Sequence, residues 1–214
     1  SFFIGQDNII KNNSVLKNMI KNNRFSSMIL YGPPGSGKTS LANIISSTTD
    51  NYFVKISAVT SGTKEIKEII ELAKDNLSMY NKRTILFIDE IHRFNKMQQD
   101  YLLEFVENGD IIFIGATTEN PAYEVNNALL SRVIVFELQA LSFENLKDII
   151  DNAILNDEFL KNKKISYTED GISYLIKMSN GDARTALNYL ELIIDNLESE
   201  DKVISEYKIR NILD

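Results

Sequence analysis

Two adjacent carboxylates, the only histidine of the chain and an arginine stand within five positions at the start of the stretch DEIHRFNKMQQD, residues 89–100. Carboxylates and imidazoles bind metal ions, and a carboxylate can also act as a general base in hydrolysis. Acidic residues are equally common at the beginning of a surface helix, where the helix dipole favours negative charge. The stretch by itself leaves these three interpretations open.

A phosphate-binding loop precedes this stretch. Residues 32–39 read GPPGSGKT, which satisfies G-x-x-x-x-G-K-[ST], and they stand between an apolar run and a helical pattern. The glycines allow the backbone to turn successive N–H groups toward a phosphate, and the following helix adds the positive end of its dipole. The residues expected to contact the nucleotide are Pro34, Gly35, Ser36, Gly37, Lys38, Thr39 and Ser40.

The last residues of the loop have specific expected roles. Lys38 should reach the β and γ phosphates, and the hydroxyl of Thr39 should ligate Mg²⁺. The other interpretation is a glycine-rich turn at a helix start. It is the weaker one, because a chance match to this pattern in a chain of this length is expected on the order of 1 time in 100.

The acidic pair gains a role from this loop. Asp89 and Glu90 follow the apolar run Ile85–Ile88, and ligands of open α/β sheets bind beyond the carboxyl ends of the strands. We expect Asp89 to hold Mg²⁺ through water and Glu90 to polarise the water that attacks the γ-phosphate. The pair Thr117–Thr118 ends the run that begins at residue 111, and a hydroxyl there can hydrogen-bond the same water.

Short apolar runs that alternate with helical patterns predict the elements that position these residues. The runs lie at residues 28–31, 52–56, 85–88, 111–114 and 134–136. Continuous apolar strands alternating with helices indicate an α/β fold of the P-loop NTPase kind, a parallel sheet with helices on both faces. An amphipathic helix is expected over residues 8–22.

The pattern changes after about residue 140, where the strands are expected to stop. Helices are predicted at residues 143–156, 169–178, 182–197 and 204–213. We therefore expect a nucleotide-binding α/β domain over residues 1–140 and a small all-α lid domain over residues 141–214.

Composition excludes several classes of protein. The net charge of −7 is not that of a strongly basic nucleic-acid-binding domain, so any DNA contact needs a local patch, a ring of subunits or segments outside this chain. The absence of cysteine excludes disulfides and thiolate metal sites and fits a reducing cytoplasm. No apolar run is long enough to span a bilayer. Because the chain begins at Ser1 rather than Met, we expect a fragment of a longer protein.

Five motifs occur in the order found in AAA+ ATPases. They are GPPGSGKT, ILFIDE, GATTEN, LLSR and GDARTALNYLE. The block from Asp89 to Arg132, with SAVTSGTKEIKEII at 57–70, more specifically resembles the RarA/MgsA family of replication-associated recombination ATPases, whose eukaryotic relative is the Werner-helicase-interacting protein. Two positions depart from the family pattern. Ser40 replaces a second threonine, and Glu104 replaces a proline, which puts the turn within that helical segment in doubt.

The resemblance implies roles for residues that spacing does not assign. Thr118 corresponds to the sensor-1 residue, and Arg132 to the arginine finger that completes the active site of an adjacent subunit. Arg184 corresponds to sensor 2, which reaches the phosphates of its own subunit, and Ile4 and Gly5 to the segment that lines the adenine pocket.

Helix chemistry bears on Arg184. If Asp182 caps the helix that follows, Arg184 lies in its first turn, where the dipole disfavours a cation, and a phosphate would supply the reason for one. For both arginines the other interpretation is an ordinary surface residue.

The resemblance also implies a biological setting. It implies an ATPase that uses ATP and Mg²⁺, forms ADP, and acts at stalled replication forks with DNA forks, ends and single-stranded regions as effectors. A homotetramer is expected through a C-terminal domain that this chain lacks, with replication proteins such as single-stranded DNA-binding protein as candidate partners. No membrane partner is expected, and the location is cytoplasmic, nucleoid-associated in a bacterium.

Three alternatives stay open. Two are a clamp-loader subunit and a RuvB-like branch-migration ATPase, and the segment ENPAYEVN argues against both. The third is a nucleotide-binding scaffold with little hydrolysis. For His92 we expect a local structural or supporting role, because hydrolysis by this arrangement needs no imidazole.

Overall fold

The computed structural model describes residues 3–10, 14–161, 164–197 and 202–213, and the chain divides into two compact units. The first unit contains Gln6–Gly32 and Gly37–Leu138. The second contains the short segment that ends at Gly5, the segment Pro33–Ser36 and the chain from Gln139 onward. The division therefore lies close to residue 140, and two short N-terminal segments group with the second unit.

Five strands form the sheet of the first unit. They are β1 (Met28–Tyr31), β2 (Tyr52–Ser57), β3 (Thr84–Asp89), β4 (Ile111–Thr117) and β5 (Ile134–Glu137). The strand order is β2-β3-β4-β1-β5, and every neighbouring pair is parallel. β4 is buried along its whole length and β3 at all but its last residue. Such burial explains why these strands read as continuous apolar runs.

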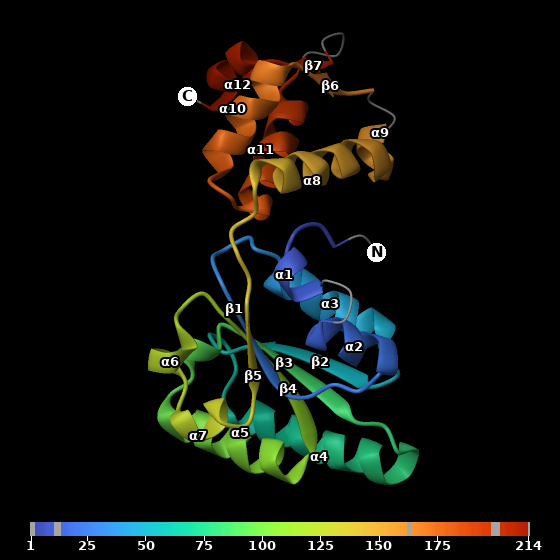
Figure 1. Ribbon diagram of the computed structural model, residues 1–214, viewed down its shortest axis with the longest axis vertical. Coiled ribbons are helices and arrows are strands. Elements are labelled where there is room, and N and C mark those ends of the chain that lie inside the picture. Colours follow the sequence, from blue (N-terminus) through green and yellow to red (C-terminus); the bar gives the residue numbers. More distant parts are fainter. Residues whose placement is uncertain (1–2, 11–13, 162–163, 198–201, 214) are drawn as a thin grey trace. The chain divides into compact units, whose positions relative to one another are not determined.

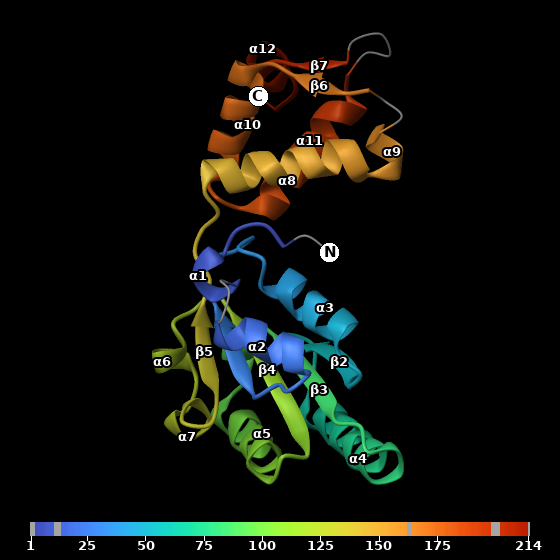
Figure 2. The same cartoon turned by 45° about the vertical axis from the view of Figure 1, so that its right-hand side comes forward.

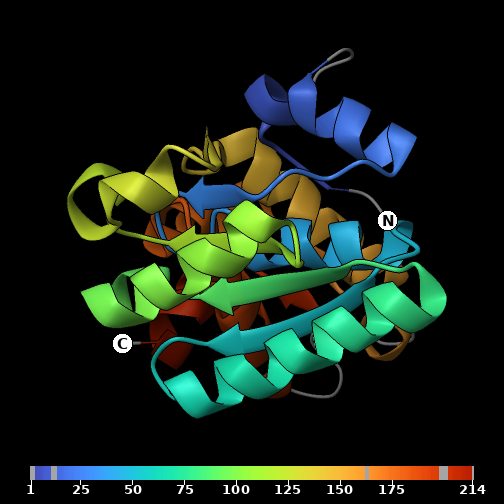
Figure 3. The same ribbon diagram turned by 90° about the horizontal axis from the view of Figure 1, so that it is seen from below.

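Helices cover both faces of this sheet. Helices α4 (Thr63–Tyr80) and α5 (Lys96–Asn108) lie on one face, and α2 (Val15–Asn22) and α3 (Lys38–Thr48) on the other (Figures 1 and 2). In Figure 3 the teal helix α4 and the green helix α5 lie in front of the strands. No helix in the described ranges is both long and apolar enough to cross a membrane.

The core on the α4–α5 side shows how the sequence builds these layers. Alternate strand residues point to this face and meet the apolar stripes of α4 and α5. The cluster includes Ile29, Leu86, Ile88, Phe113, Ile66, Ile70, Leu102 and Phe105. The predicted α/β class with helices on both faces is confirmed.

The single helix expected over residues 8–22 is wrong. The structure has α1 (Asp7–Ile10) and α2, and residues 11–13 lie outside the described part of the chain. Ser14 begins the second helix, because its hydroxyl accepts a hydrogen bond from the N–H of Lys17 at 3.2 Å. The turn that was in doubt at position 104, where the family pattern has a proline, is absent, since α5 runs unbroken through Glu104.

The second unit is predominantly helical, as expected. Its helices are α8 (Phe143–Asn156), α9 (Glu158–Lys161), α10 (Glu169–Ser179), α11 (Ala183–Asp195) and α12 (Glu206–Leu213). They enclose a core of its own that includes Leu146, Ile150, Ile172, Leu175, Leu190, Ile193 and Ile209. This core explains why the unit is compact by itself.

The expectation that strands stop after about residue 140 needs a correction. Strands β6 (Ser166–Tyr167) and β7 (Val203–Ile204) form a short parallel pair in the second unit (Figure 2). The helix expected from residue 204 consequently begins at Glu206. Two-residue strands are too short to produce a periodic pattern, and their pairing joins segments far apart in the sequence.

One hydrogen bond in this unit gives a prediction about stability. The hydroxyl of Tyr167 donates to Oδ1 of Asp151, on α8, at 2.5 Å. Burial, and then this hydrogen bond, raise the pKa of Tyr167 to about 12. The unfolded chain releases its phenol proton first, at about pH 10. The contribution of the hydrogen bond to stability should therefore be full below about pH 10 and lost as the pH rises to about 12.

Tyr167→Phe should lower the free energy of unfolding of this unit by about 1 kcal/mol at neutral pH and remove that pH dependence. Urea unfolding near neutral pH and at about pH 11 measures both effects. Tyr207→Phe is the matched control, because that side chain is 74% exposed. Equal stability of the two variants would contradict the prediction.

Candidate active site

The loop between β1 and α3 has the backbone conformation that a phosphate requires. Gly35 and Gly37 have φ angles of +65° and +100°, in the region that glycine adopts readily. Gly37 is the N-cap of α3 and makes no side-chain cap hydrogen bond to the first N–H groups of that helix. Those N–H groups and the positive end of the helix dipole therefore suit an anion.

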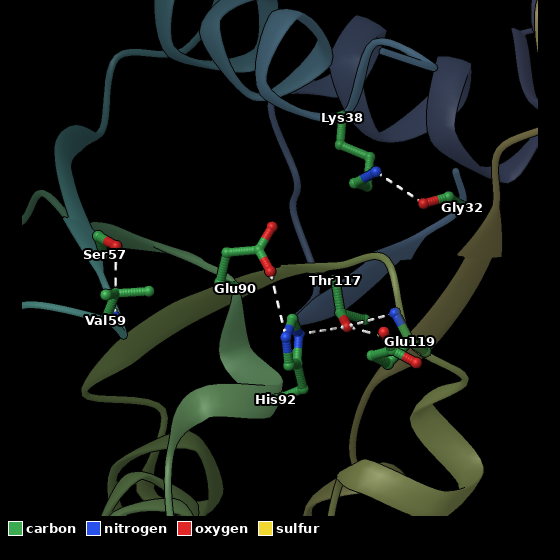
Figure 4. Close-up of polar contacts among 8 residues, drawn as sticks. All are labelled: Gly32, Lys38, Ser57, Val59, Glu90, His92, Thr117 and Glu119. Atoms are coloured by element: carbon green, nitrogen blue, oxygen red, sulfur yellow. Dashed lines mark hydrogen bonds and ion pairs between the residues drawn. The ribbon is translucent and has the colours of Figure 1, made fainter. Parts of the chain in front are cut away.

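Lys38 supplies a buried cation at this loop. Its side chain is almost buried, at 8% exposure, and Nζ donates to the carbonyl oxygen of Gly32 at 2.7 Å (Figure 4). Burying an ammonium group costs free energy unless hydrogen bonds or opposite charges compensate it, and the Gly32 carbonyl supplies one such partner. Thr39, the next residue, is half-buried, whereas Pro34 and Ser40 are exposed. A loop with this conformation and this cation fits the phosphates of a nucleotide.

The acidic pair lies at the carboxyl end of β3. Asp89 is the last residue of the strand and is paired in register with Ser57 of β2. Glu90 follows with φ +57° and ψ 43°, a left-handed conformation that is uncommon outside glycine. Such backbone strain gathers at functional sites. Figure 4 shows the side chains of Glu90 and Lys38 extending toward the same region.

The interpretation of Asp89 and Glu90 as the charged start of a surface α-helix is wrong. Only the short 3₁₀ helix η1 (Ile91–Arg93) follows them. The α-helix α5 begins at Lys96, where Asn95 and Gln98 form a capping box with hydrogen bonds of 3.0 and 2.9 Å. The acidic pair therefore lies in a strained connection at the sheet edge.

His92 connects the ends of two strands. Its Nε2 lies 3.2 Å from Oε2 of Glu90, and its Nδ1 lies 2.9 Å from Oγ1 of Thr117, the last residue of β4 (Figure 4). The sequence suggests only a supporting role for His92 and does not indicate the link to Thr117. The link depends on β3 and β4 being neighbours, which the order of the apolar runs does not reveal.

Of the two threonines at the tip of β4, Thr117 contacts both His92 and Glu119. Its hydroxyl accepts from the N–H of Glu119 at 3.0 Å and faces the ring of His92. Thr118 follows the end of the strand and is half-buried. Its role as a sensor of the γ-phosphate stays a prediction.

The side chains at the carboxyl ends of β3 and β4 are not arranged to hold a metal ion by themselves. The described part of the chain has no group of three or more His, Cys, Asp or Glu residues arranged for a metal ion. The nitrogens of His92 face Glu90 and Thr117 instead. The oxygen ligands expected at Thr39 and Asp89 are of the kind that Mg²⁺ takes together with phosphate oxygens.

Arg132 lies in the turn between α7 (Asn127–Leu130) and β5, and the short helix α6 (Pro121–Glu124) precedes it. Its Nε forms an ion pair with Oε1 of Glu107 on α5, and its Nη1 donates to the carbonyl of Ala128 at 3.0 Å and to Oγ of Ser131 at 2.6 Å. The side chain is 43% exposed. The pairing with Glu107 is not evident from the sequence, and the role as a finger stays a prediction.

The remaining predicted residues belong to the second unit. Asp182 caps α11, as expected, and its Oδ1 accepts from the N–H of Arg184 at 2.8 Å. Arg184 is exposed in the first turn of that helix. Ile4 and Gly5 precede α1, and the φ of +80° at Gly5 favours glycine there. Their roles at the nucleotide stay predictions.

Two family models match the chain. The model of the ATPase family associated with various cellular activities (AAA) matches residues 28–139, which include the phosphate loop, the acidic pair and Arg132. The chain belongs to the AAA family of ATPases. A second model, of the AAA C-terminal domain, matches residues 161–214. The predicted AAA+ resemblance is confirmed.

Curated relatives of this AAA chain confirm the more specific resemblance. ATPase WRNIP1 of Dictyostelium discoideum is 46% identical over 194 residues, which cover 91% of this chain and 22% of the relative. Replication-associated recombination protein A of Haemophilus influenzae is 42% identical over 214 residues, 99% of this chain and 48% of the relative. Its counterpart in Escherichia coli K12 is 44% identical over 200 residues, which cover 93% of this chain and 44% of the relative. The chain spans less than half the length of each.

Solved structures of RuvB share the fold of this AAA chain. The RuvB Holliday junction branch migration motor of Thermotoga maritima matches with a TM-score of 0.79 and 28% identity over 99% of this chain and 69% of that chain. The likeness confirms an AAA+ P-loop fold with a helical C-terminal region.

Proposed function

We propose that this chain is the ATP-hydrolysing module of a replication-associated recombination ATPase. The observation that carries the proposal is the buried Lys38 at the end of a positive-φ glycine loop, with the Glu90 carboxylate extending toward the same region. The curated relatives support the biological setting through their names. The test is ATP turnover by the full-length protein with and without forked DNA.

Each residue has a role in this proposal. The loop Pro34–Ser40 and Lys38 bind the phosphates. Bound Mg²⁺ would neutralise phosphate charge, with the Thr39 hydroxyl and, through water, the Asp89 carboxylate holding it. Glu90 orients and polarises the attacking water, and Thr118 hydrogen-bonds it. Arg184, Ile4 and Gly5 complete the site, as the resemblance implies.

Glu90→Gln should bind ATP with unchanged affinity and lower kcat by about 10²- to 10⁴-fold, the range for loss of a general base. The amide keeps the size of the side chain but is far less basic. Nucleotide titration and steady-state turnover on the same preparation measure the two quantities. Near-normal turnover would remove Glu90 from the proposed role.

The proposed finger gives a second test. Glu107 holds Arg132 within its own subunit, so an arginine that serves a neighbour must leave this ion pair. An exposed pair contributes about 0.2–1 kcal/mol, so Glu107→Gln should raise turnover of the oligomer by up to about fivefold. Glu104→Gln, also an exposed residue of α5, is the matched control. Unchanged or reduced turnover in Glu107→Gln alone would contradict the prediction.

The wider setting is also part of the proposal. DNA forks, ends and single-stranded regions are the effectors, the assembly is a homotetramer formed through segments outside this chain, and single-stranded DNA-binding protein is a candidate partner. The location is cytoplasmic, associated with the nucleoid in a bacterium. Because the chain carries a net charge of −7, a strong DNA contact needs a local patch, the assembly or other segments.

One alternative has a specific observation in its favour. The likeness to RuvB supports a branch-migration motor, which would move a Holliday junction in a strand-exchange assay. A nucleotide-binding scaffold would instead bind ATP tightly and show no turnover with any DNA. The same full-length oligomer, assayed on forks, ends and four-way junctions, distinguishes the three functions.

A further inference from the structure

We propose that His92 is a positioning residue that fixes the Glu90 carboxylate and links it, through Thr117, to the tip of β4. The proposal deepens the proposed function and rests on it, since it concerns the residue that polarises water. All the residues involved belong to the first unit. They come from the ends of two neighbouring strands, β3 and β4, and the turns that follow.

The imidazole is nearly buried and has a partner on each side. The His92 side chain is 10% exposed, whereas that of Glu90 is 34% exposed. A buried polar ring needs hydrogen-bond partners for both nitrogens, and Glu90 and Thr117 supply one each. Both nitrogens have a partner in this position of the ring, and the contact of Nε2 holds Oε2 of Glu90 in place.

The chemistry of the partners selects the tautomer. An ionised carboxylate only accepts hydrogen bonds, so a neutral His92 must carry its proton on Nε2 to meet Glu90. Nδ1 is then an acceptor for the Thr117 hydroxyl, which lies 2.9 Å from Nδ1 and 3.3 Å from the carbonyl oxygen of Glu119, and we assign its proton to the shorter contact. The oxygen of the same hydroxyl accepts the N–H of Glu119 at 3.0 Å. The four residues form one chain of hydrogen bonds with a single direction, from Glu119 to Glu90.

This row of hydrogen bonds includes the residues on both sides of Thr118, the proposed phosphate sensor. Thr118 lies between Thr117 and Glu119, which are joined across it by the hydrogen bond just described. A shift of Thr118 moves both neighbours, and through His92 it moves the carboxylate. The His92 contact uses Oε2, so Oε1 can accept a hydrogen bond from water. His92 thus couples the position of the γ-phosphate sensor to the orientation of the base.

The kinetic test separates positioning from binding and folding. Loss of a hydrogen-bond partner that orients a metal ligand typically costs about 10- to 100-fold, and we expect a similar factor for a partner that orients Glu90. His92→Ala in the full-length oligomer should lower kcat by that factor with KM for ATP changed by less than about twofold. His92→Gln, which has a donor and an acceptor, should recover part of the loss. Thr117→Val should lower kcat, and the double variant with His92→Ala should be no slower than His92→Ala alone.

The control is Thr48→Val, the same change near the end of α3, where the hydroxyl bonds the carbonyl of Ile44 at 2.8 Å. It should leave kcat unchanged. Thermal unfolding of each variant identifies any that fail to fold. Wild-type turnover in the His92→Ala and Thr117→Val proteins, or additive losses in the double variant, would overturn the proposal.

A spectroscopic test needs no turnover. The 214-residue chain has a single histidine, so ¹⁵N labelling of histidine gives one imidazole spectrum. We expect the Nε2–H tautomer, and both Thr117→Val and Glu90→Gln should alter the spectrum. A dominant Nδ1–H tautomer, or a spectrum that neither variant changes, would overturn the link. A wild-type oligomer that binds ATP without hydrolysing it would instead contradict the proposed function, whatever the tautomer.

Discussion

Lys38→Ala is expected to weaken ATP binding by about 100-fold or more, because a hydrogen bond to a charged group contributes about 1.5–3 kcal/mol and Lys38 is expected to contact two phosphates. The side chain is buried and already directed by its bond to the Gly32 carbonyl, so little conformational entropy is lost when a nucleotide binds. No other cation of the loop GPPGSGKT can replace it.

Thermal unfolding measures this loss directly. A ligand at 100 times its Kd stabilises the folded state by about 2.7 kcal/mol, so ATP should raise the Tm of the wild type but not that of Lys38→Ala. Lys82→Ala is the control, since Lys82 is exposed just before β3, at the opposite end of that strand from Asp89. An unchanged response of Lys38→Ala to ATP would refute the role of Lys38 at the phosphates.

Local sequence patterns were enough to predict the central strands and the phosphate loop. The strands β1, β3 and β4 are buried on both faces, so their apolar runs are unambiguous. The phosphate loop is recognisable because its conformation needs glycine at fixed positions, and Gly35 and Gly37 show the positive φ angles that explain them. The start of α2 at Ser14 was not predicted from the sequence. Ser14 interrupts a pattern that is otherwise continuous, because Ile9 and Leu16 are both buried.

The parts that could not be predicted depend on which strands become neighbours. The order β2-β3-β4-β1-β5 is not the sequence order, and it places the end of β3 beside the end of β4. Only this juxtaposition brings His92 within hydrogen-bond distance of Thr117. The ion pair of Glu107 with Arg132 likewise joins α5 to the turn before β5. Such contacts leave no periodic signal in the sequence.

Arg132→Ala is expected to lower turnover of the assembled protein by about 10³- to 10⁵-fold, the range for loss of an arginine supplied in trans. In the structure the guanidinium pairs with Glu107, and the Arg132 side chain is 43% exposed, so it can reach a neighbouring subunit once it leaves this pair. ATP affinity should change little, because the proposed finger acts on the charge that develops in the transition state. Dilution to isolated subunits should slow the wild type in the same way.

Mixing two inactive variants tests whether the arginine acts between subunits. A Glu90→Gln subunit keeps Arg132, and an Arg132→Ala subunit keeps Glu90, so a mixed oligomer contains some sites with both groups. Turnover of the mixture should therefore exceed the sum of the two separate preparations. Arg24→Ala mixed with Glu90→Gln is the control for dilution, since Arg24 is an exposed arginine in the turn that follows α2. If the Arg132→Ala mixture shows no gain, Arg132 does not complete the site of a neighbour, and its pair with Glu107 is an ordinary surface contact of α5.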